Sequence, residues 1–251
     1  MSVGENITLQ NGGAIRSETF GQGDAGDISL TAEQLTVDRQ GGLFTEISSG
    51  AFFSTGNAGN IELTVTDLVS LRNGGKISSI SAGEGVAGSV VLSAGQLEIE
   101  GNDTLSLATG IDSSAGLGST GDASGGSIEV SVAETISIQN GGSITSDTFA
   151  PGDGGNIVIS AGQLLIDQQG SSVFTGVSSE ATLGSTGNAG NVEVNVTGLT
   201  AVRNGGEINT DTLGLGDAGS VVINSRELLV DGEGNGDNLS LIHISEPTRP
   251  Y

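Results

Sequence analysis

The chain contains no cysteine and no tryptophan, and only three prolines and one histidine among its 251 residues. The absence of cysteine excludes a disulfide framework, a zinc or iron–sulfur site with cysteine ligands, and thiol catalysis. Aromatic residues make up 3% of the chain, so a buried core must consist mainly of small aliphatic side chains. No apolar run reaches the roughly 18 residues that a transmembrane helix needs, which argues against membrane insertion.

Basic residues are also scarce. Seven Lys and Arg residues face 30 Asp and Glu residues, which gives a formal net charge of −23. Nucleic-acid binding needs clustered Lys and Arg on the phosphates, so this balance argues against a nucleic-acid partner and against an anionic membrane surface. The simplest role of the acidic surface is solubility.

Residues 239–251 differ in composition from the rest of the chain. The run from Leu239 to Arg249 resembles the translated end of a sequencing adapter, and it contains His243, the single histidine. We therefore expect residues 1–238 to form the fold and residues 239–251 to lie outside it, a genuine C-terminal extension being the alternative. Without His243 the remaining chain has neither histidine nor cysteine, which disfavours an enzyme.

Internal repeats dominate what is present. The tripeptide Asn-Gly-Gly begins at Asn11, Asn73, Asn140 and Asn204, at nearly even spacing. A glycine-rich signature such as Gly23-Asp-Ala-Gly-Asp27 follows each Asn at a constant offset and recurs midway, as at Gly56-Asn-Ala-Gly-Asn60. The basic unit therefore has about 32 residues, and two alternating versions make a module of about 64.

Each unit contains three short segments typical of strands. Alternating apolar residues at 28–32, 61–65, 157–161 and 192–196 indicate strands with one buried face. A second strand follows each, and a third is centred on Ile15, Ile77, Ile144 and Ile208 in one version, and on Phe44/Ile47 and Phe174/Val177 in the other. We predict an all-β parallel β-helix, a β-solenoid of about seven coils, with one coil per unit and coils stacked ~4.8 Å apart.

This arrangement predicts columns of equivalent residues along one axis. The four Asn residues of the Asn-Gly-Gly tripeptides should align two layers apart. A corner column should contain Asp24, Asn57, Val86, Asp122, Asp153, Asn188 and Asp217. Phe20 and Phe149 occupy equivalent positions, as do Phe44 and Phe174. We expect these four rings to pack in the core or at corners, an exposed binding stripe being the alternative.

The two motifs Gly-Asn-Ala-Gly-Asn-Ile-x-Leu and Asn-Gly-Gly-x-Ile-x-Ser-x-Thr-Phe resemble the repeats of filamentous-haemagglutinin-like exoproteins of bacterial two-partner secretion. The resemblance covers about residues 5–232. It implies a right-handed parallel β-helix that is exported through an outer-membrane β-barrel transporter and forms adhesive rods on the surface of a Gram-negative-type bacterium. Because the repeat pattern is already present at residue 6, we expect this sequence to be a piece of a longer protein.

The predicted function is therefore a structural and adhesive stalk segment, secreted or held at the outer cell surface. It would need no catalytic, cofactor-binding or metal-binding residues and no cofactor. The expected partners are the transporter during export and glycans or proteins of a host or neighbouring cell. The longer units carry Ser-, Gly- and Ala-rich excursions at 48–55, 112–120 and 178–186, and such loops on a rigid scaffold are the best candidates for recognition.

Two alternatives remain open at this point. A carbohydrate-active β-helix enzyme of the polysaccharide lyase or glycosidase type would use Asp clusters with Arg or Lys on one face. A calcium-stabilised surface-layer module would hold Ca²⁺ between carboxylates of adjacent coils, with Asp122 and Asp153 as the best-placed pair. The acidic residues repeat with the turns, whereas a catalytic site should interrupt a repeat locally.

Overall fold

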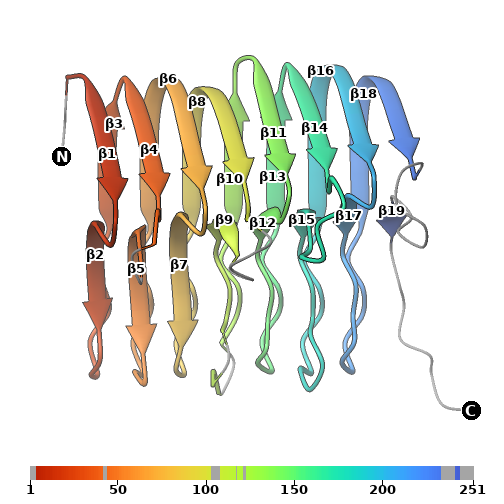
Figure 1. The fold of residues 1–251 in the computed structure, drawn as a ribbon. Helices are drawn as coiled ribbons and strands as arrows, with labels where there is room; N and C mark the ends of the chain where they lie inside the picture. Colours follow the sequence, from red (N-terminus) through yellow and green to blue (C-terminus); the bar gives the residue numbers. More distant parts are fainter. Residues whose placement is uncertain are drawn as a thin grey trace, which may run out of the picture.

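In the computed structural model the chain winds into a row of stacked coils that contribute strands to two sheets (Figure 1). The structure describes residues 4–41, 44–102, 108–116, 118–120, 123–232 and 241–243. Neighbouring strands pair in parallel, and no helix occurs among these residues. The predicted all-β solenoid of about seven coils is confirmed.

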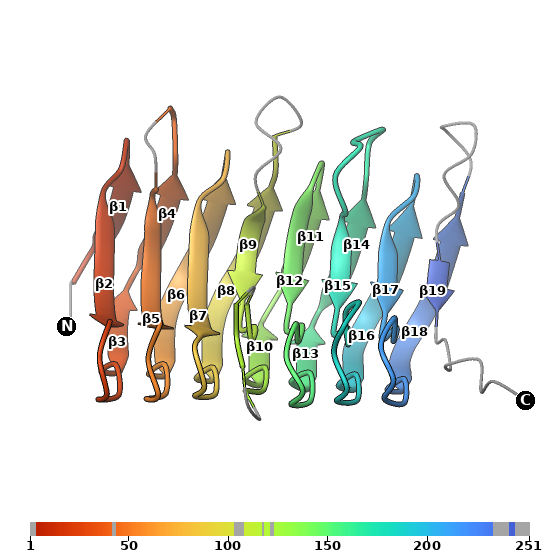
Figure 2. The same ribbon diagram turned by 90° about the horizontal axis from the view of Figure 1, so that it is seen from below.

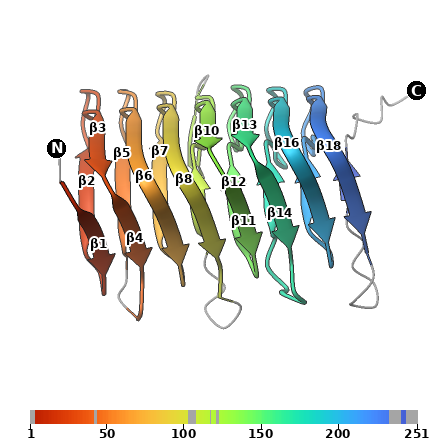
Figure 3. The ribbon, with the colours of Figure 1, turned by 90° about the horizontal axis from the view of Figure 1, so that it is seen from above.

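The larger sheet has 11 strands and forms one side of the stack (Figure 3). Its long strands β6, β8, β16 and β18 each run through two successive segments of a coil, while other coils divide the same path into two strands. The strands are β1 (Asn6–Gln10), β3 (Ile28–Ala32), β4 (Gln34–Asp38), β6 (Ile61–Arg72), β8 (Val90–Glu100), β10 (Ile128–Val132), β11 (Thr135–Gln139), β13 (Ile157–Ala161), β14 (Gln163–Asp167), β16 (Val192–Arg203) and β18 (Val221–Asp231).

The smaller sheet has eight strands and forms the opposite side (Figure 2). It receives one strand from each coil, in chain order along the stack. The strands are β2 (Ala14–Thr19), β5 (Glu46–Phe52), β7 (Lys76–Ala82), β9 (Thr109–Asp112), β12 (Gly142–Thr145), β15 (Gly176–Ser178), β17 (Glu207–Asn209) and β19 (Leu241–His243).

The register places equivalent residues in columns, and it shows that long and short coils alternate. One such column, in which each residue pairs with the next, consists of Ile28, Ile61, Val90, Ile128, Ile157, Val192 and Val221. Each Asn of the four tripeptides is preceded by a residue of a second column. These residues are Gln10, Arg72, Gln139 and Arg203, and one long coil separates each from the next. The predicted alignment of the four Asn residues two layers apart is confirmed.

A continuous aliphatic core fills the space between the sheets. It contains the inward-facing Ile, Leu and Val residues of every complete coil, and most of them are fully buried. In the smaller sheet the core column consists of Ile47, Ile77, Ile111, Ile144, Val177 and Ile208, all at most 1% exposed. Burying such side chains contributes about 1.5–3 kcal/mol each.

Asn-Gly turns connect the larger sheet to the smaller one in the short coils. Asn11, Asn73, Asn140 and Asn204 all have φ between 51° and 53°, and the glycine after each has φ between 88° and 92°. A hydrogen bond from Gly75 N to Arg72 O (2.8 Å) closes one such turn. Two successive positive φ values favour Asn followed by Gly, which explains why this dipeptide recurs.

Replacement of Asn140 by alanine should therefore destabilise the fold by about 1 kcal/mol, because alanine tolerates the left-handed region poorly. Asn140→Gly, which removes the side chain but not the conformational freedom, should stay within about 0.5 kcal/mol of the parent. Urea unfolding followed by circular dichroism measures both. Equal losses in the two variants would show that the side chain, and not its φ angle, is what matters.

The Asx residues of the glycine-rich signatures bridge neighbouring coils. Asp24 Oδ1 accepts the amide of Asn57 (2.7 Å), and Asn57 Oδ1 accepts that of Val86 (3.0 Å). Asp153, Asn188 and Asp217 continue this pattern. The predicted corner column is confirmed for six of its seven members. For Asp122, which lies outside the described residues, the prediction is wrong, because Ser124 fills the position between Val86 and Asp153: Ala87 N donates to Ser124 O (3.0 Å) and Gly125 N donates to Asp153 O (2.9 Å). The Asx oxygens satisfy backbone amides that the corner would otherwise leave unpaired.

A buried hydroxyl column runs beside the aliphatic core. Ser49 Oγ accepts the amide of Gly59 in its own coil (2.9 Å) and donates to the carbonyl of Gly26 in the preceding coil (3.1 Å). Ser79 and Ser179 repeat both bonds, and Ser146 repeats the bond to the preceding coil. The column consists of Ser17, Ser49, Ser79, Ser113, Ser146, Ser179 and Thr210. We expected aliphatic side chains to fill the interior, so this hydroxyl column is a correction.

The long coils gain most of their extra length at the corner between the two sheets. In a short coil the path from the core residue of the larger sheet to that of the smaller runs only from Leu71 to Ile77. Long coils nearly double this path, which runs from Val37 to Ile47, from Ile99 to Ile111 and from Ile166 to Val177. The predicted excursions 112–120 and 178–186 hold the smaller part of the extra length, because the paths from Ile111 to Ile128 and from Val177 to Val192 exceed that from Ile77 to Val90 in a short coil. The prediction is wrong for residues 48–52 of the loop 48–55, which belong to β5.

The segment that we expected to lie outside the fold contributes one strand. Residues 241–243 form β19, which pairs in parallel with β17 and aligns Ile242 with Ile208 of the core column. For these three residues the expectation is wrong, because an apolar residue at the right register extends the column. The rest of 239–251 lies outside the described residues.

Candidate functional site

The outer face of the smaller sheet carries two cavities. We call them the cationic cavity, over β2, β5 and β7, and the acidic cavity, over β7, β9 and β12. Their volumes are about 420 and 460 Å³. Corner residues of the long coils reach both, with Arg39 and Phe44 at the first cavity and Val173 and Phe174 at the second. The longer corners therefore wall a face that would otherwise be a flat sheet.

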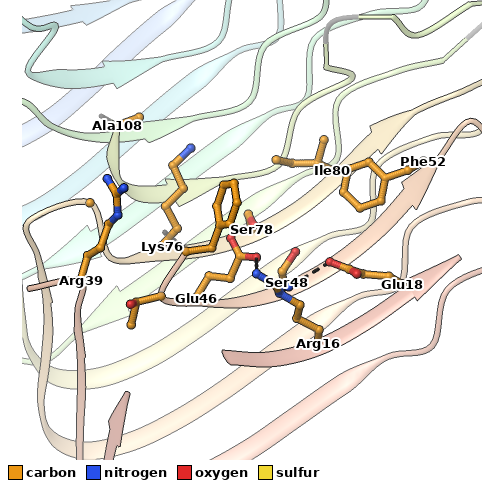
Figure 4. A pocket seen from close by; sticks show the side chains of 13 residues that line it. Arg16, Glu18, Arg39, Glu46, Ser48, Phe52, Lys76, Ser78, Ile80 and Ala108 are labelled. Atoms are coloured by element: carbon orange, nitrogen blue, oxygen red, sulfur yellow. Dashed lines mark ion pairs between the residues drawn. The ribbon is translucent and has the colours of Figure 1, made fainter. Parts of the chain in front are cut away.

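The cationic cavity brings together Arg16, Arg39 and Lys76, three of the seven basic residues of the chain. Arg16 forms an ion pair with Glu46 (2.7 Å) and a longer one with Glu18 (3.7 Å). In Figure 4, Arg39 and Lys76 lie toward one end of the cavity and Phe52 and Ile80 toward the other, with Arg16 and Glu46 between them. The lining thus combines cations, carboxylates and apolar surface.

Phenylalanine rings supply the apolar surface of this cavity. Phe44 is 63% exposed, and the Arg16 guanidinium lies 5.8 Å from the centre of its ring. Phe52 stacks on Phe20 with ring centres 5.6 Å apart, a distance typical of favourable aromatic pairs.

We expected Phe20, Phe44, Phe149 and Phe174 to pack in the core or at corners. Core packing is wrong for all four: Phe20, Phe44 and Phe149 are exposed, and Phe174 is half-buried at the rim of the acidic cavity. The space between the sheets is already filled by one column of aliphatic side chains per strand position, so these rings lie on the outer face. The corner half of the expectation holds for Phe44 and Phe174, which lie on long-coil corners between the two sheets.

The acidic cavity contains Asp112 and Asp147 beside Phe149 and Phe174. Asp147 Oδ1 accepts the amide of Glu180 in the next coil (2.8 Å). Burial, together with the nearby charges of Glu180 and Asp112, raises the pKa of Asp147 from 3.8 to about 8, although that hydrogen bond lowers it. Burial and the charge of Asp211 also raise the pKa of Glu180.

Asp112 has a cationic neighbour, the Lys76 ammonium at 3.9 Å. Sequence analysis did not find this group of carboxylates, because Asp112, Asp147, Glu180 and Asp211 come from four coils of unequal length. The register, once known, places Asp112 on β9, and places Asp147 and Glu180 two residues after Thr145 and Ser178, which pair with each other.

The predicted calcium position is only partly described. Asp153 Oδ1 already accepts two hydrogen bonds from Asn188, at 2.7 Å from the backbone amide and 3.1 Å from Nδ2, and Asp122 lies outside the described residues. Within the described part of the chain, no three His, Cys, Asp or Glu side chains are grouped so that they could hold a metal ion. The same residues include no helix long and apolar enough to cross a membrane.

No protein-family model, curated protein or solved structure matches this chain.

Proposed function

We propose that this protein is a structural and adhesive stalk segment of a secreted bacterial surface protein, exported through an outer-membrane β-barrel. The supporting observation is the continuous pairing between coils, which runs through the larger sheet from β1 to β18 with the same core columns in every layer and an Asn-Gly turn in every second one. Repeat stacks of this kind make elongated, rigid surfaces suited to display. The cavities follow the alternation of long and short coils, as a repeated recognition face would.

The test is attachment without turnover. Beads coated with the intact chain should adhere to cell layers more strongly than beads coated with an unrelated acidic protein of similar charge. Incubation of the same chain with acidic polysaccharides should release neither unsaturated nor new reducing ends. Robust product formation would contradict the stalk function and support the carbohydrate-active enzyme, while attachment no better than the control would contradict adhesion.

A further inference from the structure

The cationic cavity differs in charge from the molecule as a whole. The whole chain has a net charge of −23, yet the charged lining of this cavity is three cations against two carboxylates, with Asp112 of the neighbouring acidic cavity as a more distant partner of Lys76 (3.9 Å). Surface charge that only served solubility would not gather the rare cations at one hollow. A local excess of positive charge in an acidic protein instead favours a ligand that carries negative charge.

The other groups of the lining narrow the class of ligand. Glu18 and Glu46 would repel a densely charged phosphate or sulfate, but carboxylate oxygens bonded to Arg16 can still accept hydrogen bonds from hydroxyl groups. The exposed ring of Phe44 and the side chain of Phe52 offer flat apolar surface. Hydroxyls, an apolar ring face and an isolated carboxylate occur together in a uronic acid unit of a polysaccharide.

The dimensions of the face agree with a chain molecule. The cavity spans the strands of three coils, so a ligand that fills it would extend along the stack axis. Long coils recur every second layer, a period of about 10 Å, which is comparable to the length of a disaccharide. Arg39 and Phe44 lie on the corner of one long coil. Ala108 lies on the corner of the next long coil and also lines the cavity.

We infer that the cationic cavity binds a carboxylated oligosaccharide, with Lys76 and Arg39 facing its carboxylates and Phe44 packing against a sugar ring. This inference rests on the proposed adhesive function and names the ligand class for it. Arg guanidinium and Lys ammonium groups form charge-assisted hydrogen bonds to carboxylates, which are roughly twice as strong as neutral ones. Arg16 is held by Glu46 and serves to fix the cavity wall.

Titration of the intact chain with trigalacturonate, followed by calorimetry and NMR, tests this. The fully methyl-esterified trimer has the same sugar rings without the carboxylate charges, and it should bind at least about tenfold more weakly than trigalacturonate. Lys76→Gln and Phe44→Ala should each weaken trigalacturonate binding about tenfold. Arg72→Gln changes charge equally on the larger sheet, and Phe53→Ala removes a ring outside the cavity; both should bind like the parent.

Three outcomes would overturn the inference. The first is the absence of saturable trigalacturonate binding, and the second is equally tight binding of its methyl ester. The third is that Arg72→Gln weakens trigalacturonate binding as much as Lys76→Gln does. Circular dichroism of each variant shows whether it is folded. The two proposals can be told apart. Bead adhesion without trigalacturonate binding would contradict the ligand class inferred for the cationic cavity but not the adhesive stalk. Trigalacturonate binding without bead adhesion, or with cleavage of the trimer, would contradict the adhesive stalk but not the binding site.

Discussion

Replacement of Gly155 by alanine is expected to lower the free energy of unfolding by about 3 kcal/mol, the upper end of the range for overpacked sites. A Cβ at Gly155 would lie 2.0 Å from the carbonyl oxygen of Gly126 in the preceding coil and 2.3 Å from Ser146 Oγ. The backbone oxygen cannot move away without disturbing the layer below. Gly155 therefore marks a place where two coils approach so closely that only a hydrogen atom fits.

Gly23→Ala is the matched control, because Gly23 belongs to an equivalent signature but has open space around its Cβ position. It should change stability by no more than about 0.5 kcal/mol. Coils contact only their neighbours, so the loss in Gly155→Ala should be local to one interface. Hydrogen exchange should show increased exchange in β10 and β13, on the two sides of that interface. Equal stability of the two variants would disprove the packing argument.

The repeated pattern predicted most of the fold because every coil uses the same local signals for its strands and turns. Alternating Ile and Leu residues located the strands, and Asn followed by Gly located the turns with positive φ. These signals depend on neighbours within a few residues. The side-chain columns then followed, because parallel strands stacked in register place equivalent residues above one another.

The face that carries the cavities could not be predicted in the same way. It depends on how corner residues of the long coils, such as Phe44, fold back over strands of other coils. Nothing in the local pattern distinguishes a ring that points into the core from one that lies on the outer sheet face. The charged groups there come from coils of unequal length, so their proximity becomes visible only with the register.

The hydroxyl column, in contrast, had a signal in the sequence. Ser17, Ser49 and Ser79 each lie two residues after a core isoleucine, and a period of two places them on the same inward face. Serine is usually exposed, and that general preference concealed the pattern. Its partners are the glycine amides and carbonyls of the adjacent corner, so the column satisfies backbone groups that the tight corner buries.

Replacement of Asp147 by asparagine is expected to stabilise the protein by about 3 kcal/mol at pH 9. The pKa of this carboxyl is raised from 3.8 to about 8 in the fold, so the unfolded chain releases its proton at lower pH than the folded chain does. The penalty from Asp147 is absent below about pH 4, grows as pH rises, and is complete above about pH 8. At about 1.36 kcal/mol per pKa unit the full shift corresponds to roughly 5–6 kcal/mol, and partial solvation reduces it.

The asparagine variant isolates the charge, because its Oδ1 can still accept the amide of Glu180 (2.8 Å). Urea midpoints of parent and variant should agree at pH 4 and diverge steadily up to pH 8. Glu180, Asp112 and Asp211 also face this region, so the variant should keep a residual pH dependence. A difference between parent and Asp147→Asn that is constant over this pH range would show that packing, and not the buried charge, controls stability at the acidic cavity.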